Sequence, residues 1–208
     1  MVYRFFKRAF DFTSSLLLFF VISPLFLVLM VCSRISIGRP IFFHQERSGR
    51  NEKPFHLIKF RTMTNAKDAD GNLLPDNERL TKFGRFLRNS SLDELPELLN
   101  IIKGDMAVIG PRPLYMKYNA YYTEYERKRN QVRGGLIPPE SLYHDSFLTW
   151  DKQLKYEADY AENLSPKLDI QILVSVFKTL FRRKQENYGA YDRQDLDVER
   201  ADMVNIKQ

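Results

Sequence analysis

Two adjacent carboxylates, Asp93 and Glu94, follow a run of basic residues spaced three apart, and this stretch is the part of the chain best suited to chemistry. A carboxylate in such surroundings can act as a nucleophile or as a metal ligand. The basic residues share one side of a helix, where they can hold phosphate oxygens or form a plain solvated face. They are Arg79, Lys82, Arg85 and Arg88.

A further arginine, Arg112, stands between Pro111 and Pro113 in a stiff elbow. An arginine held in this way loses little entropy when it pairs with a phosphate through two hydrogen bonds. A structural pair with a carboxylate would satisfy the same geometry. Both interpretations stay open at this level.

The segment around the two acids predicts a helix start. Ser91 and Glu94 have the spacing of a capping box, and Pro96 is tolerated only near the first turn of a helix. Unpaired backbone N–H groups and the helix dipole favour anions there, so a carboxylate stays ionised and a phosphate is also welcome. Simple helix capping is the competing interpretation.

Several other elements must position these residues. The patterns predict strands at 40–45 and 55–60 joined by a turn at 47–51, a polar loop over 64–78, and an amphipathic helix over 79–88. A turn at 103–106 leads to a strand at 107–109, and helices are expected over 114–130 and 167–183. The last helix suits a membrane surface or a protein core equally well. The polar chain from Glu186 onward is expected to lie outside the core.

An uncharged run from Phe12 to Ser33 predicts a membrane segment, since a helix of this length measures about 33 Å. A cleaved signal peptide and a lipoprotein signal fit poorly, because small residues are missing where cleavage would need them. Ser23 and Pro24 lie at its centre, and proline removes a backbone donor there. A kinked spanning helix and a re-entrant helix with both ends in the cytoplasm are therefore the alternatives. Basic residues at both ends favour the second.

Composition narrows the class of protein. The chain has 208 residues, of which 44% are apolar and 28% charged, and this excludes a wholly disordered protein. A single cysteine, Cys32, excludes an internal disulfide. The net charge of +6 arises entirely within residues 1–60, and balanced charge beyond them argues against a nucleic-acid-binding module.

The ordered set of motifs resembles the small monotopic phosphoglycosyl transferases of bacteria, the bacterial sugar transferase family. The resemblance covers residues 1 to about 185. It is carried by Gly38-Arg39-Pro40-Ile41-Phe42-Phe43, by the run from Phe55 to Met63, by Thr81-Lys82-Phe83-Gly84-Arg85-Phe86-Leu87-Arg88, by Ser91-Leu92-Asp93-Glu94-Leu95-Pro96, by Lys103-Gly104-Asp105-Met106 and by Gly110-Pro111-Arg112-Pro113-Leu114.

The resemblance implies that a sugar 1-phosphate moves from a UDP-sugar to a polyprenol (undecaprenyl) phosphate with release of UMP, and that Mg²⁺ is required. Asp93 would be the nucleophile that forms an aspartyl phosphosugar intermediate. Glu94 would help to bind the metal, together with Asp93, or deprotonate the lipid phosphate. Substrate phosphates would be held by further residues, and Asp169 matches an acidic position of less defined role. The implied substrate-binding set is Lys59, Arg61, Thr62, Arg85, Arg88, Arg112 and Asp169.

The implied fold is α+β, with an N-terminal re-entrant membrane helix and a small mixed α/β catalytic domain that carries interfacial amphipathic helices. The expected domains are 1–36 for the membrane helix, broken at Ser23-Pro24, 37–185 for the catalytic domain, and 186–208 for a polar tail. The expected location is the cytoplasmic face of the bacterial inner membrane, in contact with membrane lipid.

One segment departs from the family pattern. From Gly134 to Asp145 the chain lacks the usual Gly-Trp-Ala-Gln-type stretch and the arginine after it, so no residue is carried over there. Two other interpretations compete with the covalent enzyme. One is a membrane-tethered protein that binds phosphate or nucleic acid without catalysis. The other is an enzyme in which Asp93 is only a metal ligand.

Overall fold

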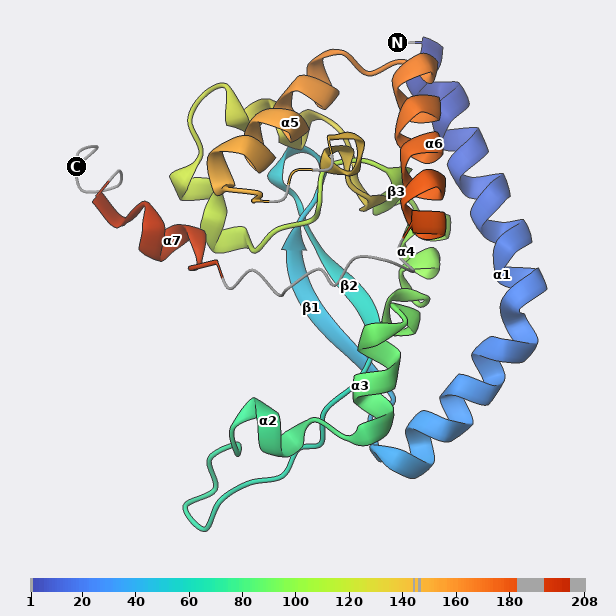
Figure 1. Cartoon of the computed structure of the whole chain (residues 1–208), viewed down its shortest axis with the longest axis vertical. Helices are drawn as coiled ribbons and strands as arrows, with labels where there is room; N and C mark the ends of the chain where they lie inside the picture. Colours follow the sequence, from blue (N-terminus) through green and yellow to red (C-terminus); the bar gives the residue numbers. More distant parts are fainter. Residues whose placement is uncertain (1, 144, 146, 183–192, 203–208) are drawn as a thin grey trace. The chain divides into compact units, whose positions relative to one another are not determined.

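The computed structural model describes residues 2–143, 145, 147–182 and 193–202, which form a mixture of helices and short strands (Figure 1). The expected α+β class is therefore confirmed. The elements are α1 (Val2–Ser36), β1 (Phe42–Ser48), η1 (Arg50–Glu52), β2 (Pro54–Phe60), α2 (Asp76–Arg79), α3 (Lys82–Asn89), η2 (Leu92–Glu94), α4 (Glu97–Lys103), β3 (Met106–Ile109), η3 (Met116–Tyr121), η4 (Glu126–Gln131), β4 (Gly134–Ile137), η5 (Pro139–Leu142), α5 (Trp150–Glu162), α6 (Pro166–Arg182) and α7 (Leu196–Glu199).

The chain divides into two compact units, each built from separate segments. The anchor unit comprises Phe12–Gln45 and His56–Lys103, and the carboxy-terminal unit comprises Met1–Asp11, Glu46–Phe55 and Gly104–Gln208. The domain boundaries expected at residues 36 and 185 stay predictions, and the second lies outside the described residues.

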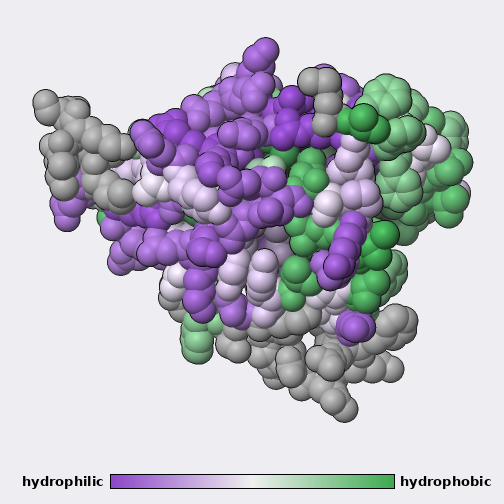
Figure 2. Space-filling model, turned by 90° about the horizontal axis from the view of Figure 1, so that it is seen from above, coloured by the Kyte–Doolittle hydropathy of each residue, from purple (hydrophilic) through white to green (hydrophobic). Residues whose placement is uncertain are grey.

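Helix α1 is long and apolar enough to cross a membrane, with a mean hydropathy of 2.8 over its most apolar 18 residues. Only 17% of that window is buried. Figure 2 shows hydrophobic residues gathered at the right of the view, where Figure 1 shows α1. Pro24 lies inside α1, and the Ser23 hydroxyl donates to the carbonyl of Phe20 at 2.8 Å. The helix is visibly bent in Figure 1, as the missing donor of an internal proline leads one to expect.

The core of the anchor unit forms where α1 meets the β1–β2 hairpin. Phe26 of α1 packs against Phe60 of β2 with ring centroids 5.1 Å apart, and Phe42 of β1 lies 5.4 Å from Phe60. Leu29 and Leu87 complete the buried cluster. The predicted hairpin is confirmed, but its first strand covers 42–48 instead of the predicted 40–45, and its second strand begins one residue earlier than predicted.

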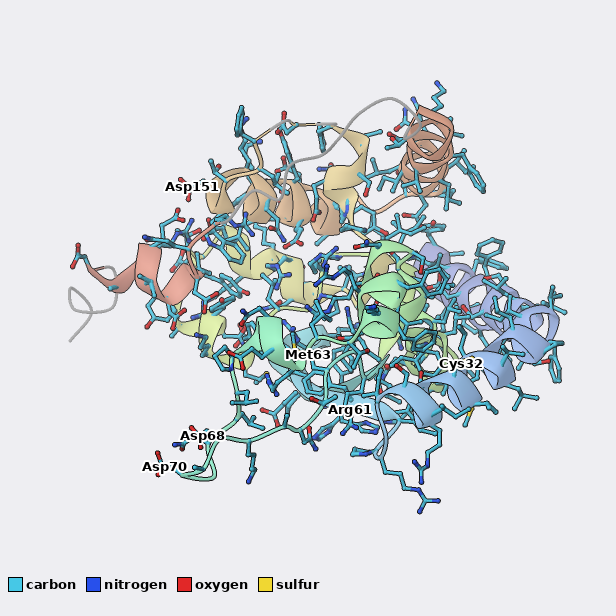
Figure 3. The ribbon with its side chains drawn as sticks, turned by 60° about the horizontal axis from the view of Figure 1, so that its bottom comes forward. Cys32, Arg61, Met63, Asp68, Asp70 and Asp151 are labelled. Carbon is cyan, nitrogen blue, oxygen red and sulfur yellow. The ribbon has the colours of Figure 1, made fainter. Side chains whose placement is uncertain are left out.

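A long loop leaves the end of β2 and carries Asp68 and Asp70 at its tip, with both side chains exposed (Figure 3). Asp68 accepts hydrogen bonds from the backbone N–H groups of Asp70 and Asn72 at 3.0 and 2.8 Å. Asp68 therefore closes the turn at the tip of this loop.

The carboxy-terminal unit is organised around a parallel pair of strands, in which Met106 of β3 faces Gly134 of β4 and Ile109 faces Ile137. A Cβ atom on Gly135 would lie 2.1 Å from the nitrogen of Gly110, so the close approach of the chains after β3 requires glycine. Two buried clusters form the core of this unit, one that includes Ile109 of β3 and one formed by residues after β3 and of η3, α5 and α7. The two clusters are Ile109, Val132, Tyr160, Ala161 and Ile172, and Leu114, Tyr118, Tyr122, Trp150, Leu154 and Leu196.

Two expectations for this unit are corrected. Residues 114–130 form the 3₁₀ helices η3 and η4 rather than an α-helix. The segment from Glu186 onward is not wholly outside the core, because Leu196 of α7 is fully buried against Trp150, whose indole N–H donates to the carbonyl of Gln194 at 2.9 Å. The prediction followed the polar composition, and one apolar residue was enough to dock the short helix.

Candidate active site

Asp93 and Glu94 lie in the single 3₁₀ turn η2, directly before α4. Ser91 ends the preceding segment in the left-handed conformation, with φ of 55°, and its side chain caps no backbone group. The predicted capping box is therefore wrong. The two acids nevertheless stand beside the start of α4, and Pro96 immediately precedes that helix, as expected.

Lys59 on β2 links the acidic turn to the hairpin. Its ammonium nitrogen lies 2.7 Å from Oε1 of Glu94 and 3.2 Å from Oε1 of Glu97, the first residue of α4. Burial alone would lower the pKa of Lys59, but the charges of Glu97 and Glu94 outweigh it and the pKa is raised. Lys59 is therefore held as a cation between two carboxylates.

Asn100 fixes α4 against the edge of β2 through both ends of its amide. Its Oδ1 accepts from the backbone N–H of Ile58 at 3.0 Å, and its Nδ2 donates to the carbonyl of His56 at 2.8 Å. Asn100 is 1% exposed, so these bonds are shielded from water. Asn100 and Glu97 thus position α4 against β2. No pattern in the sequence selects them, because their partners lie on a strand about forty residues away.

Helix α3 brings its basic residues to the end of β2. Thr81 caps the helix by accepting from the backbone N–H of Gly84 at 2.8 Å. A Cβ atom on Gly84 would lie 1.8 Å from the carbonyl oxygen of Thr62, so only glycine permits this approach. Nε of Arg88 then donates to Oγ1 of Thr62 at 3.0 Å. The predicted pairing of basic helix and neighbouring acids is thus present within one unit.

The charge state of Asp93 reflects competing influences. Burial raises its pKa, the nearby positive charge of Lys59 lowers it, the charge of Glu94 raises it and Arg88 lowers it; the net direction is upward. The helix start was expected to favour the ionised form, and burial works against this effect. Asp93 is thus partly desolvated while two cations remain close enough to favour its charge.

Arg61 and Arg85 belong to the same unit but lie in different settings. Arg61 is 8% exposed, and its Nη2 donates to the carbonyl of Ile37 at 2.8 Å. Its Nε and Nη1 are buried without a hydrogen-bond partner among the described residues, and burial lowers its pKa. Arg85 is exposed on α3. Because these two nitrogens are buried, the expected contact of Arg61 with a substrate phosphate stays a prediction.

The acidic pair suits a Mg²⁺ ion by its chemistry. Protein sites for Mg²⁺ commonly supply one or two carboxylates, and water and substrate phosphates fill the other positions. Asp93 and Glu94 provide two adjacent carboxylates. Within the described part of the chain no group of three or more His, Cys, Asp and Glu forms a metal cage. The donor set therefore fits a metal that is shared with substrate.

Arg112 belongs to the carboxy-terminal unit, where its backbone is held on both sides. Its N–H donates to Oε1 of Glu157 at 2.9 Å, and its carbonyl accepts from Nη2 of Arg129 at 2.5 Å. Glu157 and Arg129 form a buried ion pair with 2.6 Å between Oε2 and Nε. The side chain of Arg112 is exposed. A buried pair thus fixes the elbow and leaves the guanidinium available for a ligand.

Asp169 of α6, also in the carboxy-terminal unit, is 7% exposed and bonded within that unit. Its Oδ2 accepts from the hydroxyl of Tyr3 at 2.5 Å and lies 2.9 Å from Nζ of Lys7, and its Oδ1 lies 2.6 Å from the hydroxyl of Tyr160. The carboxylate therefore joins the start of α1 to α5 and α6. Its expected role in substrate binding stays a prediction.

The segment from Gly134 onward that departs from the family pattern forms β4 and η5. Glu140 of η5 has an Oε2 that is buried and has no hydrogen-bond partner in the described residues. Burial raises the pKa of Glu140 to about 8, the charge of Glu157 adds to the rise, and Arg112 and Arg129 oppose it. This segment therefore places a predominantly protonated acid beside the Glu157–Arg129 pair at neutral pH.

Comparison with known proteins shows the family to which the chain belongs. Residues 2–183 match the model of a family described as bacterial sugar transferase. The chain therefore belongs to the bacterial sugar transferase family, and the expectation of an enzyme of the phosphoglycosyl transferase class is confirmed.

Three relatives illustrate the range of the similarity. An uncharacterized sugar transferase, EpsL, of Bacillus subtilis (strain 168) is 44% identical over 190 residues, covering 90% of this chain and 94% of that protein. The exopolysaccharide production protein ExoY of Sinorhizobium fredii is 33% identical, covering 84% and 83%. A UDP-glucose:undecaprenyl-phosphate glucose-1-phosphate transferase of Xanthomonas campestris pv. campestris is 34% identical over 73% of this chain, which spans 34% of that longer protein.

Proposed function

We propose that this protein transfers a sugar 1-phosphate from a UDP-sugar to undecaprenyl phosphate and releases UMP. The observation that carries the proposal is the position of Asp93, partly desolvated and close to the positive charges of Lys59 and Arg88. Relatives whose names describe transfer of glucose 1-phosphate to undecaprenyl phosphate support the same reaction.

In the first step a carboxylate oxygen of Asp93 attacks the phosphorus that bears the sugar. A bond forms between that oxygen and phosphorus, the bond from phosphorus to the bridging oxygen breaks, and UMP leaves with the electron pair. The product is an aspartyl phosphosugar. Partial burial of Asp93 supports this role, because a less hydrated carboxylate is a better nucleophile.

In the second step an oxygen of the undecaprenyl phosphate attacks the same phosphorus. The bond to Asp93 breaks, the free carboxylate is regenerated, and the lipid carries the sugar diphosphate. Glu94 accepts a proton from the lipid phosphate if that group arrives protonated. The contact between Glu94 and Lys59 supports this assignment, since it holds the carboxylate next to Asp93.

Four cations of the anchor unit, Lys59, Arg61, Arg85 and Arg88, hold the phosphate oxygens during both steps. Arg88 is oriented by its bond to Thr62, and Arg61 has two buried donors without partners among the described residues. Guanidinium groups fixed in this way stabilise the charge that develops on a transferring phosphoryl group. We assign Lys59 and Arg85 of the same unit to this task. The expected contact of Arg112, which belongs to the carboxy-terminal unit, stays a prediction.

We also propose that Asp93 and Glu94 hold Mg²⁺ together with the substrate diphosphate. When bound, the ion would neutralise charge on the phosphate oxygens and help UMP to leave. The two adjacent carboxylates support this choice, because Mg²⁺ prefers oxygen ligands and keeps positions for phosphate.

The membrane segment is proposed to be re-entrant, so that both ends of α1 face the cytoplasm. Pro24 within α1 and the basic residues at both flanks support this topology. Single cysteines introduced by Val2→Cys and Lys53→Cys in a Cys32→Ser background test it. Neither should react with an impermeant maleimide in intact spheroplasts, and both should react after permeabilisation. Labelling of Val2→Cys alone in intact cells would instead indicate a spanning helix.

A direct test of the reaction is to incubate the purified protein with Mg²⁺, undecaprenyl phosphate and a panel of UDP-sugars, and to measure UMP. One or more UDP-sugars should yield UMP and a lipid-linked product in equal amounts. Release of UMP with none of them, from a protein that binds nucleic acid or phosphate, would favour the non-catalytic alternative.

A further inference from the structure

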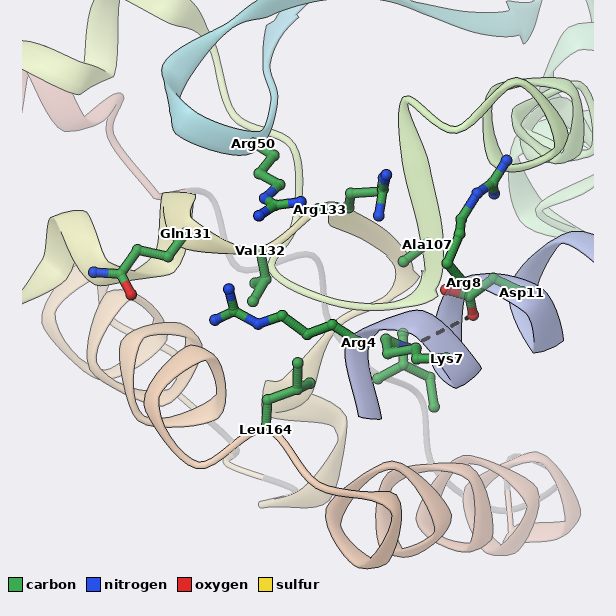
Figure 4. A pocket seen from close by; sticks show the side chains of 11 residues that line it. Arg4, Lys7, Arg8, Asp11, Arg50, Ala107, Gln131, Val132, Arg133 and Leu164 are labelled. Carbon is green, nitrogen blue, oxygen red and sulfur yellow. Dashed lines mark ion pairs between the residues drawn. The ribbon is translucent and has the colours of Figure 1, made fainter. Parts of the chain in front are cut away.

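An arginine-rich pocket lies in the carboxy-terminal unit, apart from the residues assigned to catalysis (Figure 4). It has a volume of about 40 Å³, and a wider recess of about 540 Å³ shares four of its arginines. Figure 4 shows the side chains of Arg4, Arg50 and Arg133 lining this space. We call this site the arginine pocket and define it by Arg4, Arg8, Arg50 and Arg133.

The arginines come from segments that are distant in the sequence. Arg4 and Arg8 stand one turn apart at the start of α1, Arg50 begins η1 at the turn of the hairpin, and Arg133 directly precedes β4. Nε of Arg133 donates to the carbonyl of Gly104 at 2.7 Å, which fixes its side chain. The fold thus gathers like charges that would repel one another in the absence of an anion.

The pocket is lined by one acid, Asp11, and four arginines. Asp11 lies 3.6 Å from Lys7 and accepts from the backbone N–H of Val108 at 3.3 Å, so it is already engaged. Among the residues that the structure describes, no carboxylate pairs with Arg4 or Arg50. Both side chains are exposed and can reach a ligand.

The pKa of Arg133 is lowered, and the positive charges around it contribute to this shift. Burial lowers its pKa, the charges of Arg8 and Arg50 lower it further, and Asp11 and Asp105 only partly oppose them. A bound anion would offset this repulsion, and guanidinium groups pair well with phosphate oxygens. The chemistry of the pocket therefore suits a phosphate group.

Apolar side chains beside the pocket indicate where such a phosphate comes from. Phe5 lines the wider recess and is 72% exposed, and Phe6 and Phe10 on the same turns of α1 are also exposed. A small soluble anion would make no apolar contact with these rings. A membrane lipid, in contrast, carries acyl chains that cover exposed phenylalanines next to its phosphate.

We propose that the arginine pocket binds the phosphate of an anionic membrane phospholipid and so fixes the N-terminal end of α1 at the lipid headgroups. The ligand has a net negative charge, because neither Arg4 nor Arg50 has a carboxylate partner among the described residues. This inference does not depend on the proposed reaction, and binding tests it without any measurement of turnover.

The test uses the full chain purified in a neutral detergent, with dioctanoyl phosphatidylglycerol as the anionic probe and dioctanoyl phosphatidylcholine as the zwitterionic control. Affinity is measured by thermophoresis as a function of the mole fraction of lipid in the micelle. Arg50→Gln and Arg4→Gln should each weaken phosphatidylglycerol binding about tenfold, equivalent to ~1.4 kcal/mol. Phosphatidylcholine should bind weakly to all forms of the protein.

Lys53→Gln provides the matched control, since Lys53 is an exposed cation three residues from Arg50 and lies outside the pocket. It should leave lipid affinity within twofold, and Arg50→Lys should restore most of the binding. Equal melting temperatures of the lipid-free variants confirm their folding. Unchanged affinity in both arginine variants, or an equal loss in Lys53→Gln, would overturn the proposal. Displacement of the lipid by inorganic phosphate at equal concentration would overturn the assignment to a lipid.

Discussion

The ammonium nitrogen of Lys59 lies 2.7 Å from Oε1 of Glu94 and joins the acidic turn to strand β2. The same nitrogen lies 3.2 Å from Oε1 of Glu97, so one cation serves two carboxylates. Burial raises the pKa of a third carboxylate, Asp93, and the charge of Lys59 opposes that rise. Lys59 therefore affects the pKa of the proposed nucleophile, in addition to any contact that it makes with substrate.

Replacement of Lys59 should change the pH dependence of the enzyme. The positive charge of Lys59 lowers the pKa of Asp93, so Lys59→Gln should raise that pKa and move the acidic limb of kcat/KM to higher pH. Activity at neutral pH should fall about tenfold or more. Lys82→Gln removes an exposed charge from α3 and is the control. If the acidic limb of kcat/KM does not move in Lys59→Gln, Lys59 does not influence the ionisation of Asp93.

Asp93→Asn should remove transfer without harm to the fold. The loss of the attacking oxygen charge should lower kcat by on the order of 10³-fold or more. Because burial raises the pKa of Asp93, the neutral side chain should be tolerated and the melting temperature should not fall. Asp70→Asn, at the tip of the exposed loop, should behave as the unaltered protein. Near-normal turnover by Asp93→Asn would remove Asp93 from the nucleophile role.

Gly84→Ala should damage the site through packing alone. The added methyl group would approach the carbonyl of Thr62, so α3 has to shift and the bond from Arg88 to Thr62 is lost. We expect a stability loss of about 1–3 kcal/mol and a matching fall in activity. Lys82→Ala at an exposed position of the same helix is the control in denaturant unfolding. Equal midpoints of the two variants would argue against the close approach.

Glu140 should make stability depend on pH in a defined direction. Its pKa is raised from 4.5 to about 8 in the folded protein, chiefly by burial, so the folded state holds a proton that the unfolded state loses. Stability from this group is fully present below pH 4.5 and falls as the pH rises towards 8.

Glu140→Gln should remove that dependence and raise the melting temperature at pH 8 relative to the unaltered protein, by about 2–4 °C for each kcal/mol relieved. The two proteins should melt within a degree or so of each other near pH 4. Glu124→Gln, at an exposed position, should change neither temperature. A lower melting temperature of Glu140→Gln at pH 8 would contradict the buried, protonated state.

The sequence predicted those elements whose residues repeat in a regular pattern. The long apolar helix, the hairpin around β1 and β2 and the amphipathic helix α6 were all expected, because periodicity and turn residues are local signals. The Tyr-rich segment at 114–130 has no such period, and tertiary packing bends it into 3₁₀ turns.

The acidic pair was correctly predicted to lie beside the start of a helix, which is α4. The contacts that hold the pair in place were not predicted. The left-handed conformation of Ser91 replaces the expected capping box. The bonds from Asn100 to β2 depend on strand pairing that no spacing in the sequence records. Leu196 was missed because a single apolar residue in a polar segment has no pattern to reveal it.

The most direct test of the proposed mechanism is to incubate the protein with Mg²⁺ and its UDP-sugar in the absence of acceptor lipid, and to analyse the peptide that contains Asp93 by mass spectrometry. We predict a phosphosugar adduct on Asp93, UMP in an equal amount, and loss of the adduct when undecaprenyl phosphate is added. An unmodified peptide from enzyme that turns over normally with the lipid present would contradict the covalent mechanism.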